Sequence, residues 1–276
     1  LNAEHSNLQP QAGPAYSPNI IVILVEDMGF SDLGAYGSEI PTPNLDKLAA
    51  NGARFTQFYN TGRCCPTRAA LLTGLYSHQT GVGWMTGDQG APGYRGRLNY
   101  SCVTFAEVLA PAGYFTIMTG KWHVGFEHGV TPQGRGFDRS LNLPAGGVYQ
   151  PSKAPKCDLH LNGERIAPDD PRLPRNWYAT DLWTEFGIRF IDAAIERKKP
   201  FFLYLAHVAP HFPLQADANT IATFRGKYLA GWDQLSRQRH ARQQQSGLID
   251  PAWKPEPRPA RIAAWDSLDD KQMDRF

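Results

Sequence analysis

Runs of consecutive apolar residues constrain the fold most, because each has the length and composition of a strand. The first run, "PNIIVILVED" at residues 18–27, is rich in β-branched side chains and predicts a strand buried on both faces. Similar runs occupy residues 115–120 ("FTIMTG") and 200–207 ("PFFLYLAH"). Residues 53–60 ("ARFTQFYN") alternate apolar and polar side chains, which predicts a further strand.

Helical patterns separate these runs. We expect helices at residues 42–52, beginning near Pro43 and ending at Gly52, and at residues 104–114. Strands that alternate with helices are typical of an α/β domain with a central sheet. A longer helix is expected at residues 180–197, where apolar side chains recur at helical spacing: Leu182, Phe186, Ile188, Phe190, Ile191 and Ile195.

Both ends of the chain differ in character from this core. Residues 1–17 are polar, contain Pro and Gly, and are expected to be a loose lead-in that carries no leader pattern. Residues 224–247 predict a polar helix, residues 251–270 a Pro-rich extended segment, and residues 269–276 the first turn of a helix. No internal repeat is visible.

Composition limits the function classes. The chain of 276 residues is 42% hydrophobic and 20% charged, as in globular proteins. Its net charge of +2 implies no nucleic-acid partner, and we interpret Arg237, Arg239 and Arg242 as a solvated helix face. No apolar run approaches the roughly 18 residues of a membrane span, so no membrane partner is expected. Cys102 and Cys157 either pair in an oxidising compartment or lie buried as small apolar groups.

Chemically active side chains follow the expected strands. Glu26 and Asp27 end the first strand, and Cys64 follows the second. The later two strands lead to Lys121 and His123 and then to His207 and His211. Each residue alone has an ordinary structural reading, but the ends of strands in an α/β sheet meet at one edge, which predicts a single cleft.

The stretch "GRCCPTRAALLTG" at residues 62–74 contains the adjacent pair Cys64 and Cys65. Adjacent cysteines rarely form a disulfide with each other, and their spacing is wrong for a structural zinc site. The stretch resembles the signature of the type I sulfatases, Cys-x-Pro-Ser/Thr-Arg followed by Thr-Gly. Other blocks resemble that family in the same order, among them "TPNLDKLAANGARF", "GKWHVG" and "PFFLYLAHVAPHFPLQ".

The resemblance implies an alkaline-phosphatase-like fold, with a central mixed sheet flanked by helices, over residues 18–276. It implies a sulfuric ester hydrolase, arylsulfatase-like, in which a maturation enzyme oxidises Cys64 to formylglycine. The hydrated aldehyde carries two hydroxyl groups on one carbon. One hydroxyl can attack sulfur, and the other can later expel the sulfate, so that no water needs to attack sulfur.

The resemblance also assigns roles to the remaining site residues. Glu26, Asp27 and the converted Cys64 would bind Ca²⁺, or else Mg²⁺, since hard cations prefer oxygen ligands. Lys121 would hold a sulfate oxygen, and Arg68 would point at the hydrated aldehyde or the cation. The expected roles of the histidines come last: His123 would deprotonate or hydrogen-bond the hydrate, His211 would protonate the leaving alcohol or phenol, and His207 would be structural.

Two departures from the family pattern limit this reading. Glu26 stands where the family has Asp, and the later Ser-Asp-Asn-Gly block, a second sulfate-binding lysine and the smaller C-terminal subdomain are missing. We therefore expect weak or absent activity from these 276 residues. The alternatives are a non-catalytic anion-binding remnant and a phosphate ester hydrolase of the same superfamily. The substrate is expected to be a small aryl sulfate ester, in a periplasmic or secreted protein, with the cytoplasm left open. The loop residues Trp84, Met85, Tyr94 and Tyr149 either line an aromatic pocket or simply pack.

Overall fold

The structure is a computed structural model that describes residues 17–147, 149 and 157–276. Residues 1–16 of the expected lead-in therefore lie outside the described part. The chain divides into two compact units, one formed by residues 1–27 and 60–214 and the other by residues 28–59 and 215–276. Each unit is described by itself. Among the described residues, no helix combines the length and the apolar character needed to cross a membrane.

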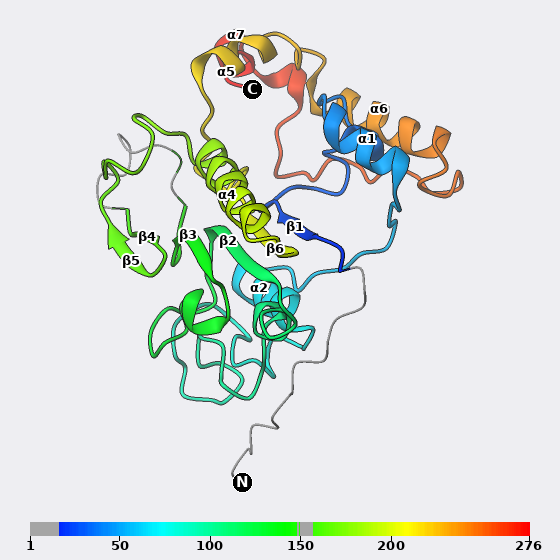
Figure 1. The fold of residues 1–276 in the computed structure, drawn as a ribbon. Coiled ribbons are helices and arrows are strands. Elements are labelled where there is room, and N and C mark those ends of the chain that lie inside the picture. Colours follow the sequence, from blue (N-terminus) through cyan, green and yellow to red (C-terminus); the bar gives the residue numbers. More distant parts are fainter. Residues whose placement is uncertain (1–16, 148, 150–156) are drawn as a thin grey trace. The chain divides into compact units, whose positions relative to one another are not determined.

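The first unit is built on a six-stranded mixed sheet (Figure 1), which confirms the expected fold class. Its strand order is β1-β6-β2-β3-β4-β5. The pairs β1–β6, β6–β2 and β2–β3 are parallel, whereas β3–β4 and β4–β5 are antiparallel. The strand bounds are Ile20–Leu24 for β1, Phe115–Lys121 for β2, Arg139–Leu143 for β3, Leu159–Leu161 for β4, Glu164–Ile166 for β5 and Phe201–Ala206 for β6.

Every residue of β2 and of β6 is buried, because an apolar core covers each face of these central strands. One core includes Leu182, Trp183 and Phe186 of α4 (Ala179–Glu196), which contacts β2 and β6. The other core includes residues of α2 (Cys64–Thr73) and α3 (Phe105–Leu109). The strands β2 and β6 thus lie between helical layers, and the carboxyl end of β2 carries Lys121.

The pairing of β2 with β6 requires a glycine at position 120. Gly120 has φ +105°, and a Cβ atom there would lie 2.0 Å from the carbonyl oxygen of Ala206. Any side chain would therefore separate the two strands just before Lys121.

Some expected elements differ from the structure. β1 is not buried on both faces: Ile21 and Ile23 are 52% and 47% exposed, because β1 lies at the edge of the sheet and pairs only with β6. Residues 53–60 form no strand. In α4, Ile188 and Ile195 are exposed, so the apolar face of this helix is narrower than its sequence suggests. The short strands β3 to β5 were not anticipated individually.

The second unit contains short helices. They are the 3₁₀ turns η1 (Gly34–Tyr36) and η4 (Trp265–Ser267) and the helices α1 (Pro43–Asn51), α5 (Ala218–Phe224), α6 (Gly231–Gln245) and α7 (Asp270–Met273). The first unit has one 3₁₀ turn, η2 (Gln133–Arg135), within its described part. The predictions for α1 and for the helical turn at the end of the chain are confirmed, and the polar helix α6 is shorter than expected.

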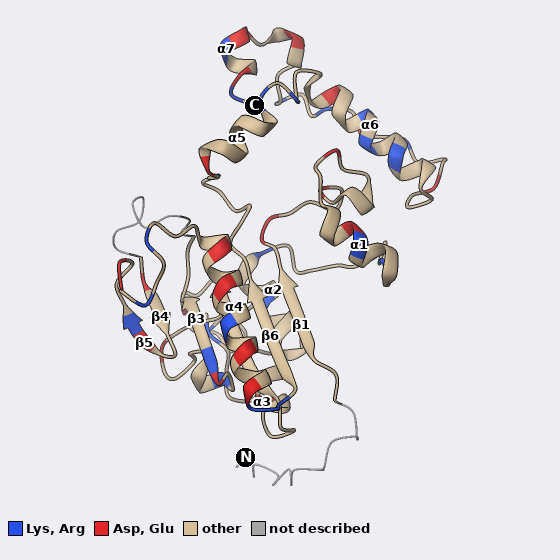
Figure 2. Ribbon diagram, turned by 45° about the horizontal axis from the view of Figure 1, so that its top comes forward, with Lys and Arg blue, Asp and Glu red and all other residues tan. Residues whose placement is uncertain are grey.

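Basic residues lie along α6 (Figure 2), and they do not all face solvent. Arg237 is exposed, as expected. Arg239, however, donates hydrogen bonds to both Glu39 and Asp32, and Arg242 donates to the carbonyl oxygen of Gly37. The interpretation of these arginines as a solvated face is therefore wrong for Arg239, which fastens α6 to residues 28–59.

Candidate active site

The helix α2 places Cys64 at its first position. Arg63 is the N-cap with extended backbone, Cys64 and Cys65 are the first two helical residues, and Pro66 is the third. The amide groups at a helix N-terminus carry partial positive charge, so this position favours an anion or a thiolate at Cys64.

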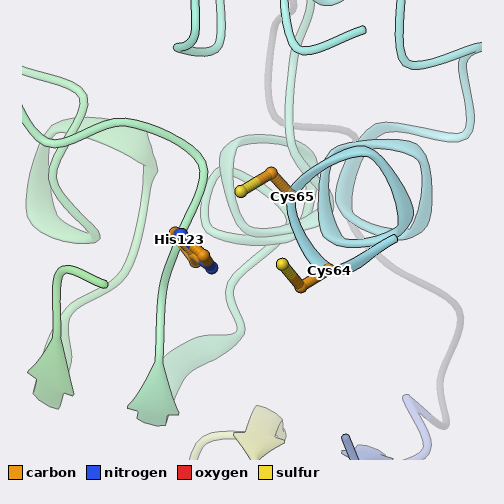
Figure 3. A group of neighbouring side chains, drawn as sticks. All are labelled: Cys64, Cys65 and His123. Atoms are coloured by element: carbon orange, nitrogen blue, oxygen red, sulfur yellow. The ribbon is translucent and has the colours of Figure 1, made fainter. Parts of the chain in front are cut away.

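His123 reaches the cysteine pair from the end of β2. Its backbone has φ +56°, a left-handed conformation, and its N–H donates to the carbonyl oxygen of Pro144 at 2.9 Å. The ligand atoms of Cys64, Cys65 and His123 all lie within 4.8 Å of one another (Figure 3). The structure therefore brings together two of the residues expected in the site, Cys64 and His123, and adds Cys65.

A buried charge cluster lies under this group. The Nζ atom of Lys121 donates to both carboxylate oxygens of Glu26, at 2.7 and 2.9 Å. The Nη2 atom of Arg68 lies 3.4 Å from Glu26 Oε2, and its Nη1 donates to the carbonyl oxygen of Lys121 at 2.6 Å. All three side chains are at most 4% exposed. One carboxylate thus faces two cations, which leaves a surplus positive charge inside the protein.

The pKa values of the two neighbouring thiols are shifted in opposite directions. The Cys65 thiol donates a hydrogen bond to Cys64 and holds the pKa of Cys64 well below its usual value; His123 and the charge of Lys121 lower it further. The same hydrogen bond, together with burial, raises the pKa of Cys65. At neutral pH the unmodified Cys64 is therefore the anionic partner of the pair.

Asp27 and His211 form a separate, more exposed pair. The Nε2 atom of His211 lies 3.8 Å from Oδ2 of Asp27, and their side chains are 33% and 59% exposed. The hydroxyl of Tyr149 donates to the backbone oxygen of His211, which fixes the loop after β6. In the described ranges, no hydrogen bond or ion pair joins His211 to Cys64.

The remaining residues named as candidates from the sequence make contacts that stabilise the fold. The N–H of His207 donates to the carbonyl oxygen of Leu24, and burial lowers the pKa of its imidazole. Tyr149 is buried in the core, while Trp84 stacks against Arg63 at 3.8 Å from the ring centroid. Tyr94 lies 3.1 Å from His78 through its hydroxyl oxygen.

The contact between Met85 and Cys64 was not predicted from the sequence. Its Sδ atom lies 3.9 Å from the Cys64 sulfur and 3.8 Å from the Cys65 sulfur. Residues 75–104 approach α2 through a long irregular loop, and no periodic pattern marks which loop residue arrives there. No sequence signal identified this contact.

The carboxylates Glu26 and Asp27 have the donor atoms of a Ca²⁺ site, but Ca²⁺ takes six to eight oxygen ligands. Both Glu26 oxygens already accept from Lys121, and Arg68 lies beside them. A divalent cation at Glu26 would therefore face two buried cations, so this arrangement does not fit a bound ion.

The fold and this site define the class of protein: an α/β protein in which the N-terminus of α2 presents Cys64 beside His123, which follows β2. Its family follows from comparison with known proteins. The sulfatase family profile matches residues 18–254, and the chain belongs to the sulfatase family.

Named relatives support this assignment. The chain is 38% identical to an arylsulfatase of Klebsiella aerogenes over 243 residues, which are 84% of this chain and 51% of the relative. It is 38% identical to human arylsulfatase A, covering 72% of this chain and 42% of the relative. The crystal structure of Ps i-CgsB aligns with a TM-score of 0.67 and 32% identity, covering 84% of this chain and 56% of that one. The chain thus spans about half the length of the curated relatives it matches.

Proposed function

We propose that this protein hydrolyses a sulfate monoester, with Cys64 oxidised to formylglycine as its nucleophile. The observation that carries the proposal is the position of Cys64, which begins α2 within the sulfatase motif and lies beside His123. The proposal also draws on the buried pair Lys121 and Arg68, whose surplus positive charge suits a sulfate group.

The side chains around Cys64 would have separate roles in the hydrolysis. Hydrated formylglycine supplies a hydroxyl nucleophile where the Cys64 sulfur now lies. The imidazole of His123, within 4.8 Å of that sulfur, would accept the proton of the attacking hydroxyl. Lys121 would stabilise negative charge on the sulfate oxygens, and Arg68, which donates to the Lys121 carbonyl, would hold the end of β2 in place.

His211 is proposed as the acid that protonates the leaving oxygen. Its exposed position suits contact with the alcohol part of a substrate, and Asp27 lies near enough to orient the ring. Because the leaving oxygen of an in-line displacement departs opposite the nucleophile, this role requires His211 to act from the side of the sulfate away from Cys64.

A divalent cation, Ca²⁺ or Mg²⁺, belongs to the proposal only as an expectation from the family. Glu26, Asp27 and the converted Cys64 are the proposed ligands. Glu26 would first have to release Lys121, so the roles given above to His123, Lys121 and His211 do not depend on the cation.

The substrate is proposed to be a small sulfate ester, aryl by similarity to the arylsulfatases. Ps i-CgsB has also been solved with k-i-k-neocarrahexaose, which makes a sugar ester the second choice. We propose a periplasmic or secreted location, where a formylglycine-generating enzyme would have acted first.

The modification of Cys64 is the first test. The chain is produced with and without a formylglycine-generating enzyme, and the peptide that contains residues 64–68 is analysed by mass spectrometry. We expect the sulfur of Cys64 to be replaced by an aldehyde oxygen only in the co-expressed sample. Retention of this sulfur in every sample would remove the proposed nucleophile.

Turnover is the second test, with 4-nitrophenyl sulfate and 4-nitrophenyl phosphate compared. We expect slow release of nitrophenol from the sulfate, because the described carboxylates hold only part of a cation site, and none from Cys64→Ala. Cys102→Ser is the matched control. Faster turnover of the phosphate, or an equal rate in Cys64→Ala, would contradict sulfatase chemistry.

A second candidate function is anion binding without turnover. The observation that favours it is the engagement of both Glu26 oxygens by Lys121, which leaves the carboxylate unavailable to a cation. Isothermal titration with sulfate and with Ca²⁺ separates the two functions: binding of sulfate alone, by a chain with converted Cys64 and no turnover, would favour this second candidate.

A further inference from the structure

Three sulfur atoms and one imidazole nitrogen gather at the start of α2 in the unmodified chain. The sulfur atoms of Cys64 and Cys65 and a ring nitrogen of His123 lie within 4.8 Å of one another (Figure 3). The thioether sulfur of Met85 lies 3.9 and 3.8 Å from the two cysteine sulfurs. Cys65 is fully buried and His123 is 6% exposed, so these atoms are already held in place by the fold.

One nitrogen of the His123 imidazole is not satisfied by the protein. The Nδ1 atom is buried and has no hydrogen-bond partner within the described residues. Buried polar atoms normally have a partner, so an unpaired nitrogen on a ring that lies beside two cysteine sulfurs calls for an explanation. A metal ion bound to the sulfurs and to Nδ1 would supply one.

We propose that the thiol form of this protein binds a single Cu(I) ion through Cys64, Cys65, His123 and Met85. Thiolate and thioether sulfur are the ligands that select soft cations, and no carboxylate belongs to the group. The two sites share residue 64, but this site differs in donor chemistry from the oxygen site expected at Glu26, Asp27 and the converted Cys64.

Local charge favours a monovalent ion over a divalent one. Glu26, Lys121 and Arg68 together carry one surplus positive charge. Two cysteine thiolates would add two negative charges, so one Cu(I) brings the whole group to neutrality. A divalent ion would leave a net positive charge in a buried region, which is costly.

The site exists only while Cys64 keeps its sulfur. Conversion to formylglycine removes that ligand, so Cu(I) binding and conversion exclude each other on one chain. The inference does not depend on the hydrolase proposal, because it concerns the unconverted chain alone.

The test titrates the reduced full chain with Cu(I) under anaerobic conditions, in competition with the chelator bicinchoninate. The protein is produced without a maturation enzyme, and mass spectrometry verifies that residue 64 retains sulfur. We expect one Cu(I) per chain. Cys65→Ser should weaken binding by more than the 10–100-fold that loss of an outer partner of a metal ligand typically costs. Met85→Leu should weaken it by a smaller factor.

Two controls keep the test decisive. Cys102→Ser and Cys157→Ser replace the other two free cysteines and should leave Cu(I) affinity unchanged. Copper X-ray absorption on the wild-type chain should show sulfur and nitrogen neighbours, a readout that does not require any variant to fold. Absence of a stoichiometric Cu(I) site, or equal affinity in wild type, Cys65→Ser and Met85→Leu with unchanged circular dichroism, would overturn the proposal.

Discussion

Each unit of the molecule contains a cluster of charged side chains, and the two clusters differ in burial and in charge balance. In the first unit, Glu26 faces Lys121 and Arg68, and all three are at most 4% exposed. In the second unit, Arg239 and Arg242 balance Asp32 and Glu39, and these four side chains are 22–38% exposed.

The difference in burial and charge balance indicates a different role for each cluster. The second cluster joins α6 to residues 28–59, with bonds of 2.6 and 2.7 Å, and partly meets solvent that screens it. The first cluster carries an excess of positive charge away from water, an arrangement that is poor for stability by itself. Buried unbalanced charge beside a reactive side chain is typical of a site that awaits an anion.

The largest expected effect comes from breaking the buried cluster. Glu26→Gln leaves the buried cations Lys121 and Arg68 without a counter-charge and should lower the free energy of unfolding by about 3–5 kcal/mol. Arg239→Met should cost less, about 1 kcal/mol or below for each partly exposed pair. Urea unfolding followed by hydrogen exchange of peptides from β2 and from α6 measures each loss where it occurs.

A double variant checks the reason for this loss. If the cost reflects uncompensated buried cations, adding Lys121→Met to Glu26→Gln should recover part of the stability that Glu26→Gln alone loses. Equal costs for Glu26→Gln and Arg239→Met would show that burial does not distinguish the two clusters.

The buried cluster could be predicted from the sequence only in part. The apolar runs before Glu26 and Lys121 predict that both residues lie near the ends of strands, and the structure agrees: Glu26 comes two residues after β1, and Lys121 is the last residue of β2. Their direct pairing was not predicted, because it depends on the order β1-β6-β2, which places β6 between the two strands. Cys64 was assigned to the end of a strand that does not form; the start of α2 presents it instead.

The unpredicted parts share a physical cause. Arg239 and Met85 act through partners about 200 and 20 residues away in the chain, and a single sequence does not encode such pairings as a local pattern. The exposed side of β1 was missed because a run of apolar residues does not reveal whether a strand is central or at an edge.

A smaller effect should come from adding an anion. If the buried cluster awaits sulfate, sodium sulfate at ten times its dissociation constant should stabilise the first unit by about 1.4 kcal/mol, the mass-action value for one site. Thermal unfolding in sulfate against chloride at equal ionic strength measures the shift. Arg68→Met should abolish it and Arg239→Met should not; a shift that survives Arg68→Met would place the anion elsewhere.

The pH dependence should separate the clusters further. The Arg239 guanidinium, through its hydrogen bond to Glu39, lowers the pKa of that carboxyl below its usual value of 4.5. A lowered folded-state pKa contributes stability that is present above pH 4.5 and is lost as the pH falls through the folded value. We expect α6 to lose protection from hydrogen exchange below about pH 4.5. Glu39→Gln should flatten this dependence, and an unchanged slope in that variant would assign it to other carboxylates.

Salt should produce the smallest effect. The Debye length falls from about 10 Å at 0.1 M to about 3 Å at 1 M salt, so NaCl should weaken the partly exposed Arg239 cluster by a few tenths of a kcal/mol. The buried cluster, shielded from ions by the protein, should respond less. Hydrogen exchange of α6 and β2 peptides in 0.1 M and 1 M NaCl compares the two in one sample, with Arg239→Met as the control that removes the response of α6. A larger response in β2 than in α6 would mean that ions reach Glu26, and the buried cluster would then have to be regarded as an open site.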